Sequence, residues 1–371
     1  MFAGRRKLLL APSPPSQFLS ATNLHPDTLR RGYLHAEDLH QLADHHYSRQ
    51  LFGHHYLHGG FHLERALERC DLAGGRGHCR HSSSRPEYRG SSHLGGDRRA
   101  PFSYMRTGFG PATYRRGIPL SRLGKRLNPF PLVHLPYHRL VNPWTLGAVL
   151  HEISHNLQSD LGLGRDVPRS IALCLLRAGM LRSVASTWTR WNREMFADMS
   201  ALLLGGPGVV GVLMDVIGRG AVTVVTFNPR GVHPTPYLRM FNSIELLRRM
   251  GFTKEAEQYR RAWTRIYPSA AAGDIPQDML RTFPKACALA VDAMCYRPYP
   301  SLGNKSLAQV IQFGRKEQQM IEEAARRLAA GVDPGIIPER FVIGAARLAL
   351  DRRLARPGVI TANFYKTLAS G

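Results

Sequence analysis

The sequence lacks the cysteine pattern of a disulfide-stabilised protein. Its cysteines are five, an odd number, and none of them forms a CxxC pair: Cys70, Cys79, Cys174, Cys287 and Cys295. Regular pairs of cysteines are typical of secreted proteins and of structural zinc modules. Their absence argues against a disulfide framework and indicates a reducing compartment, so we expect a cytoplasmic protein.

Long, uninterrupted apolar runs are also absent. The basic N-terminus is followed by a short apolar run that ends at Pro12, which is too short for a signal-peptide core. The longest apolar tract, residues 206–227, is rich in glycine and is interrupted by Asp215 and Arg219. Because a membrane-spanning helix needs about 20 apolar residues, we expect no membrane span.

Acidic residues are few relative to basic ones: 27 against 50, which gives a formal net charge of +23. A charge of this size is typical of proteins that bind nucleic acid or anionic lipid. The basic residues are spread along the chain, however, with no nucleic-acid-binding motif and no interleaved aromatic residues. Short basic runs occur at Arg115-Arg116, Lys125-Arg126 and Arg326-Arg327. Nucleic acid is therefore not expected as the main partner, although a basic nucleic-acid-binding protein stays open as an alternative.

The first hundred residues differ in composition from the rest of the chain. They hold twelve of the seventeen histidines, and residues 74–99 show almost no apolar periodicity. Such a composition predicts a largely irregular N-terminal region, residues 1–100. Three interpretations stay open: a disordered segment, a histidine-rich metal-binding tract, and a segment produced by a frame error.

From about residue 128 the apolar residues recur with mainly helical spacing. Pro131 and Pro136 predict that a short strand between them lies at the edge of a sheet. Asn142-Pro143 and Thr235-Pro236 each resemble a helix cap followed by a first-turn proline. The expected elements are a strand at 130–135, helices at 143–161 and 187–204, a β-branched strand at 221–227, and a helix from about 236 to 250.

The C-terminal third continues the helical pattern. Helices are expected at about 253–266, 277–296, 306–330 with a break at Gly314, and 338–354. The predicted fold class is mainly α with a small β-sheet, or α+β. We expect three parts: an irregular region at 1–100, a catalytic core at 101–252, and a helical region at 253–371.

The sequence from His151 to His155 is an HExxH motif. Its two histidines are four residues apart, so both project from one face of a helix and can reach one metal ion. Glu152 can reach a metal-bound water and act as a general base. The flanking residues are apolar, which predicts a buried helix. Polar side chains buried without partners cost free energy, and a metal ion would supply a partner for both histidines and the glutamate. A hydrogen-bonded structural cluster is the alternative.

A catalytic zinc ion has three protein ligands and one open position. Glu194 is the best candidate for the third ligand. Asp198 lies one helical turn later and can accept the second ring N–H of a ligand histidine, which would fix its tautomer. An ordinary pair of solvated acidic residues is the alternative for this motif.

HExxH followed by Glu194-Met195-Phe196-Ala197-Asp198, an ExxAD motif, resembles the gluzincins, the metallopeptidase clan that includes thermolysin and the CAAX-type membrane peptidases. His233-Pro234 with Arg239 resembles the HP...R segment of the CAAX-type group. The resemblance implies a zincin-like core in which His233 and Arg239 face the cleft and contact the substrate or its oxyanion. A proline-fixed turn with no part in catalysis is the alternative for this segment. The chain departs from the CAAX-type enzymes in lacking membrane helices.

Together these motifs predict a zinc-dependent metallohydrolase, a peptidase in which Glu152 activates a zinc-bound water. His151, His155 and Glu194 would bind Zn²⁺, Asp198 would support them, and the partner would be a peptide or protein substrate. A non-catalytic, zinc-stabilised helical scaffold that binds a protein partner is the main alternative. The sequence leaves open the oligomeric state and the cleavage specificity.

Overall fold

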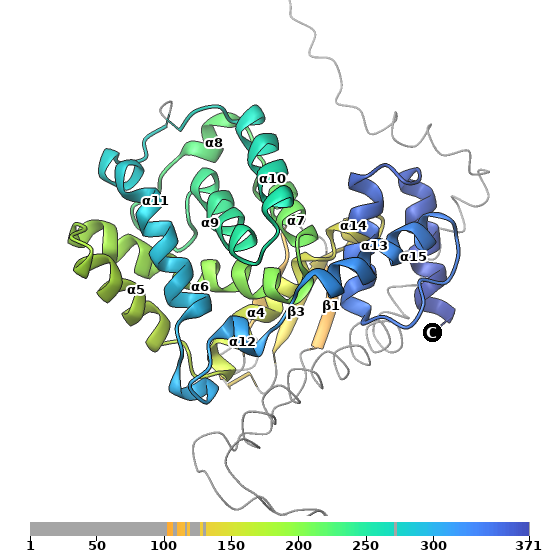
Figure 1. Ribbon diagram of the computed structural model, residues 1–371, viewed down its shortest axis with the longest axis horizontal. Coiled ribbons are helices and arrows are strands. Elements are labelled where there is room, and N and C mark those ends of the chain that lie inside the picture. The colour runs from red at the N-terminus through yellow and green to blue at the C-terminus, as the bar shows by residue number, and fades with distance from the viewer. Residues whose placement is uncertain are drawn as a thin grey trace, which may run out of the picture.

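The structure is a computed structural model that describes residues 102–106, 110–115, 117–118, 127–128, 131–270 and 273–370. The expectations for residues 1–100 lie outside the described residues, as do Arg116, Lys125 and Arg126. The described part is mainly helical and has a small sheet, which confirms the predicted fold class (Figure 1).

The sheet has three strands: β1 (Phe102–Arg106), β2 (Ala112–Tyr114) and β3 (Leu132–Pro136). The order is β1-β3-β2, with β1 parallel and β2 antiparallel to β3. The predicted strand therefore exists, but its expected position at an edge was wrong because β3 is the central strand. Pro131 precedes β3 and Pro136 ends it, so neither proline removes a hydrogen bond from the middle of the strand.

Helix α4 (Ala148–Asp160) carries the HExxH motif. A 3₁₀ turn, Pro143–Thr145, precedes it where the sequence predicted the first helical residues. Val149 of α4 packs with Val133 and Leu135 of β3, which fixes the helix against the sheet. The chain leaves the helix at Leu161 and turns at Gly162, which has a φ of +69°.

Helix α6 (Arg182–Gly205) carries the ExxAD motif and starts five residues before the predicted start at 187. It follows α5 (Asp166–Arg177), a helix that the sequence analysis did not predict. Helix α6 ends at Gly206, whose φ is +71° and whose Cα faces the ring of Phe313 without room for a Cβ. This glycine lets the chain reverse directly into α7 (Gly208–Ile217).

The expected strand at 221–227 was wrong: residues Ala221–Val225 form a short helix, α8. Preference for strands depends on packing against neighbouring strands, and in the described sheet no strand pairs with this segment. Val224 and Val225 are buried instead in the helical core. Helix α9 (Pro236–Arg249) begins at the predicted proline and ends before Gly251, as expected.

The remaining helices are close to prediction as far as residue 351. They are α10 (Thr253–Ile266), α11 (Gln277–Val291) continued by a π-turn at Asp292–Tyr296, α12 (Leu307–Val310), α13 (Arg315–Ala329) and α14 (Glu339–Asp351). Gly314 separates α12 from α13, as predicted. The last helix, α15 (Pro357–Ser370), was not predicted.

The helices form a larger and a smaller group, seen on the left and right of Figure 1. The larger hydrophobic core joins α5, α6, α9, α10 and α11, with Trp188, Trp191 and Trp263 fully buried in it. The smaller core lies between α13, α14 and α15 and is rich in alanine. The larger core therefore extends across residue 252, where the sequence analysis divided the chain.

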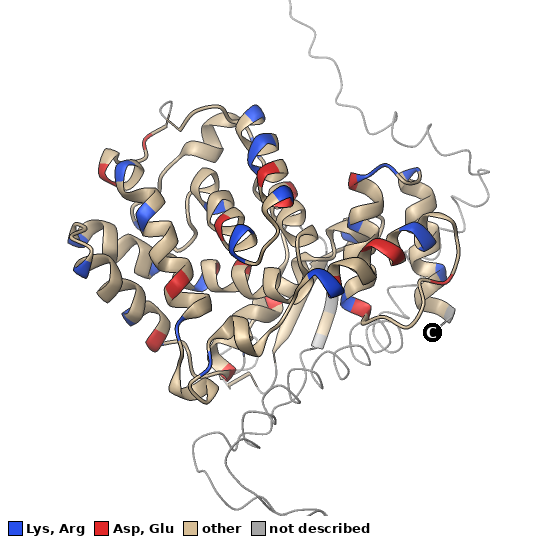
Figure 2. Ribbon diagram, viewed as in Figure 1, with Lys and Arg blue, Asp and Glu red and all other residues tan. Residues whose placement is uncertain are grey.

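Basic and acidic residues are interspersed along the described helices (Figure 2). Many arginines form ion pairs with an acid one helical turn away, such as Arg260 with Glu257 and Arg326 with Glu323. Exposed pairs of this kind contribute little to stability. Among the described helices, none has the length and apolar character to cross a bilayer.

Candidate metal centre

The two histidines of the HExxH motif point into one cleft from the same face of α4. Their Nε2 atoms lie 3.1 Å apart, and their rings meet edge to face. The side chains are 17% and 15% exposed, so they reach the cleft without facing bulk solvent. This is the arrangement that the i, i+4 spacing predicted.

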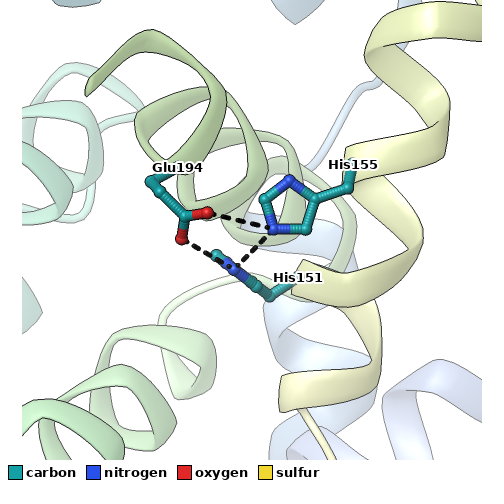
Figure 3. Close-up of side chains that lie close together, drawn as sticks. All are labelled: His151, His155 and Glu194. Atoms are coloured by element: carbon teal, nitrogen blue, oxygen red, sulfur yellow. Dashed lines mark hydrogen bonds and ion pairs between the residues drawn. The ribbon is translucent and has the colours of Figure 1, made fainter. Parts of the chain in front are cut away.

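Glu194 approaches the histidines from α6 (Figure 3). Its carboxylate oxygens lie 3.5 Å from the Nε2 atoms of both His151 and His155. Ligand atoms about 2 Å from a tetrahedral zinc ion lie about 3.3 Å from one another. The two imidazole nitrogens and the carboxylate oxygen therefore have the chemistry and the spacing of a three-ligand zinc site.

Asp198 fixes the orientation of His151 from behind. Its Oδ1 atom lies 2.8 Å from Nδ1 of His151 and accepts the Nδ1–H hydrogen bond. When the ring is neutral and keeps its proton on Nδ1, the lone pair of Nε2 points towards Glu194 and His155. Asp198 is 6% exposed and lies where the ExxAD spacing placed it.

Arg239 lines the cleft, as expected, and its guanidinium binds the two carboxylates of this group. Its contact with a substrate stays a prediction. Its Nε and Nη2 atoms donate to the two oxygens of Asp198 at 2.6 and 2.9 Å, and Nη2 also lies 3.3 Å from Glu194. The side chain is 9% exposed. Its guanidinium therefore neutralises the two carboxylates and holds α9 against α6.

His233 occupies the turn just before α9. Its Nε2 atom lies 3.4 Å from Glu194, and its side chain is 64% exposed. The residue thus borders the proposed metal position from the solvent side. The structure brings His151, His155, Glu194, Asp198 and His233 together, as the sequence predicted.

Glu152 lines the same cleft and is 5% exposed. Burial, with a contribution from the negative charge of Glu194, raises the pKa of Glu152 to about 7. A carboxylate with a pKa near neutrality is suited to exchange protons with substrate. The charge of His151 and that of the buried Arg139 oppose this rise, and Arg139 was not predicted from the sequence.

The other site residues have strongly shifted pKa values. Burial disfavours the protonated form of His151, but the hydrogen bond and charge of Asp198 outweigh it and raise the pKa of His151 to about 9. Burial and the neighbouring His151 lower the pKa of His155 to about 4. Burial favours a neutral Glu194, but His151 and Arg239 outweigh it and lower its pKa to about 2. At neutral pH and without a metal ion, these shifts favour a protonated His151 and a neutral His155.

The cleft has a volume of about 540 Å³ and continues on both sides of the histidines. Towards the C-terminal end of α6 its wall is apolar and comes mostly from α7, with Val209, Val212, Leu213 and Val216. Towards the opposite end it includes Thr113 of the edge strand β2 and two arginines, Arg115 and Arg193.

The two arginines were missed as site residues. Arg193 directly precedes Glu194, and this adjacency was a usable signal. Arg115 was noted only as part of a basic run, and nothing in the sequence connects residue 115 with residue 193.

The chain matches no protein-family model, no curated protein and no solved structure.

Proposed function

We propose that this protein is a zinc-dependent metallohydrolase that cleaves peptide bonds. The observation that carries the proposal is the convergence of His151, His155 and Glu194, with mutual distances of 3.1 to 3.5 Å, at the wall of an open cleft. A purely structural zinc site has four protein ligands and no cleft. This difference favours an enzyme over a zinc-stabilised scaffold.

The three ligand side chains would hold the ion, and a zinc ion bound there would supply a Lewis acid for hydrolysis. Asp198 keeps His151 in the tautomer that leaves Nε2 free. Glu152, with its pKa near neutrality, takes a proton from the attacking water and delivers it to the leaving amine.

Two further features support a peptide as substrate. Within the described sheet, the edge strand β2 pairs with β3 alone, and β2 also borders the cleft, so its other edge offers backbone groups to an extended chain. His233 stands at the exposed rim beside Glu194, where its imidazole can donate a hydrogen bond to a developing oxyanion. These features fit an amide in an extended chain better than a small ester.

The test combines metal analysis with an activity assay on the full chain. We expect about one zinc ion per wild-type chain and hydrolysis of a quenched fluorescent peptide library. Glu152→Gln should keep the zinc and lose about 10²- to 10⁴-fold in turnover. His151→Ala and Glu194→Ala should lose both zinc and activity.

Glu257→Gln, an exposed change on α10, is the matched control and should alter neither property. Circular dichroism of each variant checks that the fold is retained. A zinc-free wild type, or undiminished zinc in folded His151→Ala, would overturn the metal site. Loss of zinc in Glu152→Gln would mean that the carboxylates are assigned wrongly.

A further inference from the structure

The cleft contains two arginines whose charges no described acidic side chain neutralises. Arg115 follows directly after β2, and Arg193 precedes Glu194 on α6. Within the described residues neither guanidinium forms an ion pair or a side-chain hydrogen bond. Arg239 in the same cleft is bound by Asp198 and Glu194, so its charge is already matched.

Arg115 lies within the electrostatic influence of Arg193 in this cleft. Arg115 is partly buried, and burial together with the positive charge of Arg193 lowers the pKa of Arg115. Two cations that face one cleft without an anion repel each other. An anion bound between them would remove this repulsion and could accept hydrogen bonds from both planar groups.

The arginines lie at one end of the cleft and the apolar wall lies at the other. His151 contacts Asp198 while His155 contacts Glu194, so α4 and α6 run antiparallel past the metal position. Leu202, beside the apolar wall, lies eight residues after Glu194, which is about 12 Å along the helix. The metal position therefore lies between an apolar end and a cationic end.

We infer that Arg115 and Arg193 bind a carboxylate of the substrate while its apolar side chains lie against α7. This inference rests on the proposed peptidase function and names the class of peptide. The carboxylate has two possible sources. A C-terminal carboxylate would make the protein an exopeptidase that acts from the C-terminus, and an aspartate or glutamate side chain would make it an endopeptidase for acidic sequences.

The experiment measures equilibrium binding, so that it does not depend on hydrolysis. The background is the full chain carrying Glu152→Gln, which keeps the cleft but does not consume the probe. The probes are N-terminally labelled hexapeptides of alternating alanine and leucine. One is a free acid, one is the C-terminal amide, and a third set of amides carries a single glutamate at each position in turn.

We expect the free acid, or one of the glutamate amides, to bind about tenfold to hundredfold more tightly than the plain amide, the gain typical of hydrogen bonds to a charged group. Which peptide gains identifies the source of the carboxylate. Arg115→Gln and Arg193→Gln should each reduce the preference, and the double variant should abolish it. Arg326→Gln, an exposed change on α13, is the control and should leave it unchanged.

Equal binding of all peptides, a preference that survives in the double variant, or no binding to any peptide would overturn the inference. Turnover of the best probe by the wild-type chain is measured separately. A carboxylate preference without turnover would remove the proposed function and leave the anion site standing. Turnover without a carboxylate preference would support the proposed peptidase function and overturn the anion site.

Discussion

Two buried arginines, one at the cleft and one where α7 meets α14, have the same surroundings at first sight. Arg239 and Arg347 are each 7% exposed, and each binds two carboxylates. Arg239 binds Asp198 and Glu194. Here the carboxylates are almost completely enclosed, with side-chain exposures of 5% and 12%.

At the second position Arg347 binds Asp215 of α7 and, at 2.9 Å, Asp351 of its own helix. These carboxylates are 43% and 32% exposed, so water solvates part of their charge. Neither belongs to a group of potential metal ligands in the described part of the chain. An arginine between two acids is thus not by itself the mark of a functional site; the histidines and the open cleft make the difference.

Replacing Arg239 or Arg347 should show the largest difference between the two clusters. Arg239→Met removes the guanidinium that binds two enclosed carboxylates, which should destabilise the metal-free protein by about 3–5 kcal/mol, the cost typical of breaking a buried ion pair. Arg347→Met should cost less because its carboxylates reach water. Zinc content should fall only in Arg239→Met. Urea denaturation with chelator and elemental analysis test this, and an equal loss of zinc in both variants would erase the distinction.

His233 has no counterpart at the Arg347 cluster, and its removal tests the exposed rim of the site. His233→Ala should lower turnover by about a hundredfold, since one oxyanion donor contributes about 10²–10³. Zinc content and thermal stability should stay unchanged because the side chain is largely exposed. Steady-state kinetics and calorimetry decide the matter, and unchanged turnover would reduce His233-Pro234 to a structural turn.

Asp198 and Asp215 form a matched pair for a more conservative change. Asp198→Asn weakens the support of His151 and should lower zinc affinity by about 10- to 100-fold, as the loss of such an outer partner commonly does. Asp215→Asn removes a carboxylate from the other cluster and should leave zinc affinity unaltered. Competition with a fluorescent chelator measures both. Equal affinities in the two variants would mean that Asp198 does not orient the ligand.

The two arginine clusters also differ in protonation, because only the cluster around Arg239 contains a histidine, His151. With a pKa of about 9, His151 is protonated at neutral pH in the metal-free protein and must lose its proton to bind zinc. Zinc affinity should therefore rise about tenfold per pH unit between about pH 6 and 8. His155 and Glu194, with pKa values of about 4 and about 2, are already deprotonated in that window. A flat profile, after correction for the chelator's own protonation, would show that His151 is neutral before zinc arrives.

Local patterns predicted much of the fold and the centre of the site. The HExxH and ExxAD spacings placed His151, His155 and Asp198 correctly because a helix fixes the positions of residues three or four apart. Prolines and glycines located the ends of α9 and α10 and the break at Gly314, because proline favours the first turn of a helix and glycine favours its end.

The failures lie where distant segments decide the outcome. The valines of α8 favour a strand locally, but they meet a helical core and form a helix. The ion pair of Arg239 with Asp198 was not predicted, because the two residues lie 41 positions apart in sequence. Arg115 joins the cleft only through the pairing of β2 with β3, which no spacing in the sequence reveals.

The position of Arg239 has a consequence for biosynthesis. All three potential ligands have been synthesised once translation reaches residue 194. Arg239, the arginine that binds Glu194 and Asp198, comes 45 and 41 residues after them, on α9. Domains fold as units while the chain leaves the ribosome from its N-terminus. A nascent chain that stops short of α9 carries the three potential ligands but lacks the guanidinium that binds both carboxylates. The proposed metal centre is therefore completed by a helix that contributes none of its ligands, and we expect a chain truncated before α9 to leave Glu194 and Asp198 less enclosed.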